Sequence, residues 1–170
     1  VDELTFYSAD ENSLRIVAKE GEKLGNIYVY DIAKDQAGNN LISDEGLYVI
    51  DKTKYKQVGN ILPTAIGGLT NTFNYKNWML DFTVDYRFGG KMVSENLKYG
   101  MGAGQYENTL EYRETGVTLE GVNQNTGAPN DVHLSGADYY MNTFNWGADT
   151  WTEKGAVYDN SFIKMREMSV

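Results

Sequence analysis

Hydrophobic and polar residues alternate strictly along one segment near the middle of the chain. From Trp78 to Phe88 every even position is apolar, and the odd positions from Asp81 to Arg87 are all polar. A period of two is the pattern of a β-strand with one apolar and one polar face. The eleven residues also match the roughly 9–11 that a tilted strand needs to cross a bilayer. The predicted membrane-facing residues are Trp78, Leu80, Phe82, Val84, Tyr86 and Phe88.

The residues before this segment predict its partner in a hairpin. A two-residue turn at Lys76 and Asn77 places Tyr75 opposite Trp78, and asparagine tolerates the positive φ that such turns need. The pairs that follow are Phe73 with Leu80, Leu69 with Val84, Thr72 with Asp81 and Thr70 with Thr83. Both strands then agree on the apolar face, apart from Asn71 opposite Phe82. Because a slip of one residue would reverse every side chain, this agreement supports the register.

Other segments on both sides of the hairpin also predict strands and turns. Residues 26–32 are rich in β-branched and aromatic side chains and predict a strand, and residues 47–50 predict another. Residues 35–40 combine Asp, Gly and Asn, which is typical of a turn. Residues 162–170 resemble a strand, but apolar residues occur at both odd and even positions, so its facing stays open. Residues 1–21 predict no element with certainty.

The charges are distributed unevenly along the 170 residues, whose net charge is −9. Residues 1–58 hold eleven acids and seven bases, residues 59–94 two acids and three bases, and residues 95–160 ten acids and three bases. The acidic balance argues against nucleic acid as a partner, since its phosphates would be repelled. A hairpin nearly free of charge fits an apolar membrane setting, and it fits a buried hairpin of a soluble protein equally well.

Residues 95–160 have no sustained helical or strand period. The segment contains nine glycines and nine aromatic residues, and it is longer than a structureless loop of a compact soluble domain usually is. Outer-membrane barrels combine long extracellular loops with short periplasmic turns. The tight turn at residues 76–77 and this long segment reproduce that asymmetry. It favours a barrel over a soluble sandwich.

No catalytic, metal or cofactor constellation is visible, so we expect neither an enzyme nor a bound cofactor. The chain has no cysteine and a single histidine, His133, without a serine or carboxylate at a recognisable spacing. Residues 35–40 miss the ligand spacing of a calcium loop. A glycosidase pair could be sought among Glu111, Glu114 and Glu120, but nothing fixes these residues in a cleft. The aromatic residues that could stack on a sugar or contact a partner are Tyr139, Tyr140, Trp146 and Trp151, with loop packing as the alternative.

Several short motifs, in this order and spacing, resemble the C-terminal barrel region of SusC-like (SusC/RagA) TonB-linked outer-membrane transporters. The likeness runs from about residue 20 to residue 170. The residues that carry it are Val58-Gly59-Asn60, Pro63, Gly67 to Phe73, Tyr75-Lys76-Asn77, Arg87-Phe88-Gly89-Gly90 and Asn160 to Ser169. The chain departs from the family pattern at Ile61, Thr64 and Ala65, where the family usually has proline, aspartate and an aromatic residue.

The resemblance implies an all-β fold, namely an antiparallel segment of a large transmembrane β-barrel of the TonB-dependent-receptor type with about 22 strands. Residues 1–170 are expected to be the C-terminal portion of this barrel in the outer membrane of a Gram-negative bacterium. Residues 95–160 are then a long extracellular loop. The plug domain and the final strands are expected to lie in a longer parent protein, because the chain opens at Val1 without a signal-peptide pattern.

The resemblance also implies the function and the partners. Family members import glycans or peptides with energy relayed by TonB, and a SusD-like surface lipoprotein caps the barrel. The implied partners are a SusD-like lipoprotein, outer-membrane lipid, an oligosaccharide or peptide substrate, and TonB through a segment not in this chain. A soluble all-β carbohydrate-binding module remains the alternative, on the strength of the 13% aromatic content and the acidic loops.

Overall fold

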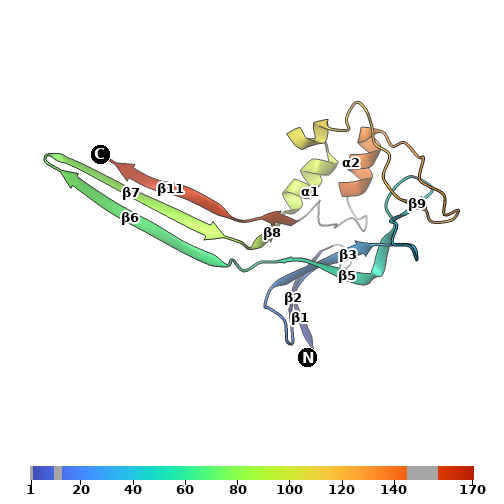
Figure 1. Cartoon of the computed structure of the whole chain (residues 1–170), viewed down its shortest axis with the longest axis horizontal. Helices are drawn as coiled ribbons and strands as arrows, with labels where there is room; N and C mark the ends of the chain where they lie inside the picture. The colour runs from blue at the N-terminus through green and yellow to red at the C-terminus, as the bar shows by residue number, and fades with distance from the viewer. Residues whose placement is uncertain (1, 10–12, 145–156) are drawn as a thin grey trace.

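The computed structural model describes residues 2–9, 13–144 and 157–170, which form mostly antiparallel β-sheet with a few short helices (Figure 1). The strands are β1 (Glu3–Ala9), β2 (Leu14–Lys19), β3 (Asn26–Ile32), β4 (Leu41–Ile42), β5 (Ile50–Asn60), β6 (Ala65–Tyr75), β7 (Trp78–Phe88), β8 (Lys91–Val93), β9 (Val122–Asn123), β10 (Val157–Asp159) and β11 (Phe162–Ser169). The helices are α1 (Glu95–Gly102), the 3-10 helix η2 (Glu107–Leu110) and α2 (Gly136–Phe144). No helix in these ranges has the length and apolar character needed to cross a membrane.

Strands β6, β7 and β11 form a three-stranded sheet in the order β11–β7–β6, which we call the ribbon. Figure 1 shows the ribbon extending away from the rest of the molecule, with the C-terminus near its far end. The predicted hairpin register is confirmed from Tyr75 opposite Trp78 to Leu69 opposite Val84, and the structure continues the same register to Ala65 opposite Phe88. The turn lies at the predicted residues, but Lys76 and not Asn77 takes the positive φ, at 52°.

A β-bulge in β11 settles the facing that the sequence leaves open. Met165 pairs with Val84 and Glu167 pairs with Thr83, so Arg166 is an extra residue on β11. Because one inserted residue shifts the alternation by one, Met168 joins Met165 on the same face of the sheet. The strand therefore presents Ile163, Met165 and Met168 to one side despite their irregular spacing in the sequence, while Phe162 at its start lies on the other side.

A second sheet, in the order β1–β2–β3–β5, forms the body at the base of the ribbon. Its fully buried apolar residues are Leu14, Val17, Ile27 and Val29, of which Leu14, Ile27 and Val29 form one cluster. The strand predicted at residues 26–32 is confirmed as β3. The strand predicted at residues 47–50 is wrong, because β5 begins at Ile50 and the residues before it turn back to pack on Ile42 in a separate core.

Residues 95–144 are folded around two short helices that the sequence analysis does not predict. Ser94 caps α1 by accepting a hydrogen bond from the Leu97 amide at 3.3 Å, and Ser135 accepts one from the Asp138 amide at 3.1 Å at the start of α2. The two helices contact each other. A second core of Ile42, Leu119 and Leu134 joins this region to the segment between β3 and β5.

The ribbon and the body meet where three strand breaks lie side by side. The Thr64 amide donates to the Phe88 carbonyl at 2.8 Å, the Gly89 amide donates to the Ser161 hydroxyl at 2.9 Å, and the Asn160 amide donates to the Gly90 carbonyl at 3.0 Å. Gly89 and Gly90 have φ of 71° and 80°, a conformation that favours glycine. These contacts keep the strands in register across the break.

Candidate functional site

One face of the ribbon is apolar on all three strands, and we call it the apolar face. The pairing places the six predicted residues of β7 on it, together with residues of both neighbouring strands. Those neighbours are Ala65, Gly67, Leu69, Asn71, Phe73 and Tyr75 of β6, and Ile163, Met165 and Met168 of β11. Trp78 is 70% exposed, Ile163 67% and Met168 64%. The edges of this face are therefore uncovered by the described part of the chain.

The opposite face of the ribbon is lined by hydrogen-bonded polar side chains over its middle. The hydroxyls of Thr70 and Thr83 lie 3.1 Å apart, and the Thr72 hydroxyl donates to the Asp81 carboxylate. The Arg166 guanidinium of the bulge donates to Asp85 at 2.6 Å. Apolar residues of this face lie toward its two ends: Ile66, Met79 and Phe162. The ribbon thus separates an apolar surface from a polar one by the thickness of a single sheet.

Aromatic residues lie at both ends of the apolar face. Tyr75 and Trp78 flank the turn and are each 70% exposed, and at the other end the rings of Tyr86 and Phe88 are 5.2 Å apart. The eleven residues of β7 give ten steps of about 3.3 Å, or ~33 Å along the strand. At a tilt of about 40° this length covers a height of ~25 Å, the height of the apolar band of an outer-membrane barrel.

The structure describes two of the four predicted loop aromatics. Trp146 and Trp151 lie outside the described residues. Tyr140 on α2 is 6% exposed and its hydroxyl donates to the Asn108 carbonyl at 3.1 Å, so its ring is part of the packing. Tyr139, one residue earlier on α2, lies at the edge of a cavity.

This cavity of about 540 Å³, which we call the tyrosine cavity, lies between the body and α2. Tyr48, Tyr112 and Tyr139 line it, together with the carboxylates of Asp31 and Glu120. The rings of Tyr112 and Tyr139 are perpendicular, with centroids 5.3 Å apart. Sequence reasoning missed this site because its residues come from segments far apart in the chain. Glu120 was a candidate only as one of three arbitrary glutamates.

The phenolate forms of Tyr48, Tyr112 and Tyr139 are disfavoured in this cavity. Burial, together with the neighbouring Tyr112, Tyr140, Tyr48 and Glu111, raises the pKa of Tyr139 to about 12. A hydrogen bond to Glu111 raises the pKa of Tyr112. Burial and the charge of Glu120 raise the pKa of Tyr48. Carboxylates around the cavity thus oppose any further negative charge inside it.

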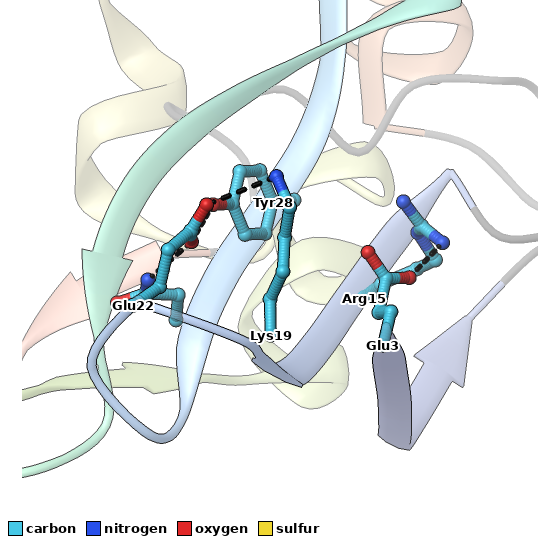
Figure 2. Close-up of polar contacts among 6 residues, drawn as sticks. Glu3, Arg15, Lys19, Glu22 and Tyr28 are labelled. Carbon is cyan, nitrogen blue, oxygen red and sulfur yellow. Dashed lines mark hydrogen bonds and ion pairs between the residues drawn. The ribbon is translucent and has the colours of Figure 1, made fainter. Parts of the chain in front are cut away.

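A polar cluster fastens the turn between β2 and β3 (Figure 2). The Glu22 carboxylate accepts hydrogen bonds from the Tyr28 hydroxyl and from the side-chain amide of Asn26, and it forms an ion pair with Lys19 at 3.0 Å. These contacts lower the pKa of Glu22 to about 2, with the Tyr28 hydrogen bond as the largest cause. The cluster lies on the surface and joins neighbouring strands, so its role is structural.

The remaining chemical candidates make local contacts. His133 places Nδ1 3.2 Å from the Thr118 hydroxyl and Nε2 2.9 Å from the Thr115 carbonyl, so it links two segments of its own loop region. The Asp35 carboxylate accepts the amides of Ala37 and Asn39, each at 2.8 Å, as in an ordinary turn. Within the described ranges, no three His, Cys, Asp or Glu side chains are grouped so that they could hold a metal ion.

Comparison with known proteins identifies no family for this chain. No protein-family model matches it, and no curated protein sequence does so either.

Proposed function

We propose that this chain is part of an outer-membrane TonB-dependent transporter of the SusC-like type, which imports glycans or peptides together with a SusD-like surface lipoprotein. The observation that carries the proposal is the ribbon, a sheet with one uncovered apolar face and one hydrogen-bonded polar face. In a barrel wall the apolar face contacts lipid and the polar face lines the interior. The likeness to the SusC-like motifs supports the choice among barrel families.

The edges of the ribbon support a larger wall. Strands β6 and β11 lie at the two sides of the three-stranded sheet, and they are eleven and eight residues long. Long open edges are normally paired or protected in a native protein. Further strands on both sides would satisfy the edges and extend the apolar face into a continuous band.

The test uses the full-length parent protein. We expect it to need detergent for solubility, and to migrate faster on a gel when left unboiled than when boiled, because a closed barrel resists denaturation by the gel detergent. A monomer that stays in solution without detergent and shows no shift on boiling would overturn the proposal.

The tyrosine cavity favours a second candidate, a soluble carbohydrate-binding module. Aromatic rings beside carboxylates are a common setting for sugar recognition, and the part of the chain outside the ribbon has two buried cores. This candidate leaves the exposed apolar face of the ribbon unexplained, since monomeric soluble proteins rarely expose large contiguous apolar patches. It requires residues 1–170 alone to fold cooperatively and to bind a glycan in plain buffer, and failure to fold would exclude it.

A further inference from the structure

The tyrosine cavity has the size and the walls of a small-molecule site. Its volume of about 540 Å³ lies within the range of 300–1,000 Å³ that is typical of ligand pockets. The walls come from the end of β3, the segment before β5, β5 itself, Tyr112, residues 117–120 and the part of the chain around helix α2. The perpendicular rings of Tyr112 and Tyr139 present aromatic surface in two directions. A compact ligand with an apolar body would pack against this aromatic surface.

The charges around the cavity favour a ligand of positive charge. Asp31 and Glu120 contribute two carboxylates to the lining and Lys56 contributes one ammonium, which leaves one net negative charge. Glu111 adds a third carboxylate next to the ring of Tyr112. An anionic ligand would be repelled by this lining. A cation would be attracted by the carboxylates and by the electron-rich faces of the tyrosine rings.

We propose that the tyrosine cavity binds an organic cation, an ammonium group carried on an apolar stem. Tyr48, Tyr112 and Tyr139 in the lining offer aromatic surface to the cation, and Glu120 in the same lining supplies the opposite charge. A free amine and a lysine side chain of a peptide offer the same chemistry, so both are ligands of this class. The inference concerns the cavity and does not depend on the ribbon lying in a membrane.

The test measures binding to the full-length parent protein by calorimetry, in a maltoside detergent without choline headgroups if detergent is needed. The probes are choline, its uncharged isostere 3,3-dimethyl-1-butanol, and Nα-acetyl-lysine amide. We expect one or both cations to bind and the neutral isostere to bind at least about 10-fold more weakly, because it keeps the shape and loses the charge. Comparing choline with the lysine derivative then shows which source of the ammonium the cavity prefers.

Two matched variants test the assigned charge. Glu120→Gln should weaken cation binding by about 3- to 10-fold. Glu114→Gln removes the same charge from another exposed side chain that does not line the cavity, and it should leave binding unchanged. Tyr48→Leu should weaken binding strongly, whereas Tyr48→Phe keeps the aromatic face and should bind within about 2-fold of the wild type.

Three outcomes would overturn the inference. The first is equal binding of choline and its neutral isostere. The second is equal weakening by Glu120→Gln and Glu114→Gln, which would show a general effect of net charge. The third is binding of a neutral oligosaccharide, and of neither cation, in a way that Tyr48→Leu abolishes. None of them bears on the detergent and gel test of the transporter proposal, so the two failures are distinguishable.

Discussion

An arginine placed on either face of β7 tests the assignment of the ribbon to a membrane wall. Val84 lies on the apolar face, opposite Leu69 on one side and Met165 on the other. Thr83, one residue earlier, lies on the polar face between Thr70 and Glu167. The two positions lie at nearly the same depth, close to the middle of the eleven residues of β7. Val84→Arg and Thr83→Arg are therefore a matched pair that differs in the face alone.

The expected magnitudes follow from the depth. Arginine on the lipid face near the bilayer midplane costs about 2–4 kcal/mol. Val84→Arg should therefore raise the equilibrium constant for unfolding by roughly 30- to 900-fold. Thr83→Arg faces the polar side, where its guanidinium would lie opposite Glu167 and would change the free energy of unfolding by less than about 1 kcal/mol.

The assay is equilibrium unfolding of the full-length parent protein in phospholipid vesicles, followed by tryptophan fluorescence and by the gel shift on boiling. In a soluble protein with an open ribbon, Val84→Arg would be a surface substitution with an effect within about 0.5 kcal/mol. Equal effects of the two arginines, or a larger effect of Thr83→Arg, would refute the assignment of the faces.

Three further predictions concern packing, pH and register. A Cβ at Gly67 would lie 2.4 Å from the Tyr86 hydroxyl. Gly67→Ala should therefore lower the free energy of unfolding by about 1 kcal/mol in the wild type, and it should have no such effect in a Tyr86→Ala background. A double-mutant cycle measures this difference. The pKa of Glu22 is lowered to about 2 in the folded protein, so the ionised Glu22 stabilises the fold above about pH 4.5, and this stabilisation is lost as the pH falls toward 2. Glu22→Gln should therefore flatten the dependence of the free energy of unfolding on pH in this range. Deleting the bulge residue Arg166 should preserve the pairs of β11 and lower the free energy of unfolding by about 1 kcal/mol or less. An alanine inserted before Met168 should turn the Met168 side chain to the polar face and cost more. Unfolding in vesicles measures both effects.

The hairpin could be predicted from the sequence because its signal is local and redundant. The alternation fixes the faces of β7, and the requirement that β6 agree with it fixes the register from Tyr75 to Ala65. The facing of β11 could not be predicted, because the extra residue at Arg166 breaks the period of two and a bulge has no reliable sequence signature. The choice of Lys76 for the positive φ went against residue preference.

The helices and the cavity lay beyond this kind of reasoning. Helices α1 and α2 are eight and nine residues long, too short to show a clear period, and Ser94 and Ser135 at their starts were the usable signals. The tyrosine cavity depends on tertiary packing of segments that no local pattern connects. Tyr139 was a candidate from residue type alone, and its neighbour Tyr140 shows how weak that criterion is, since it is buried.

The most direct test of the central proposal is a cysteine scan of residues 78–88, which is straightforward because this chain has no cysteine of its own. Each single-cysteine variant of the parent protein, cleared of any other cysteine, is spin-labelled in vesicles and measured for collision with oxygen and with a water-soluble nickel complex. We expect oxygen contact at the even positions and contact with the nickel complex at the odd ones, in strict alternation. Uniform access of the nickel complex to both sets of positions would contradict it.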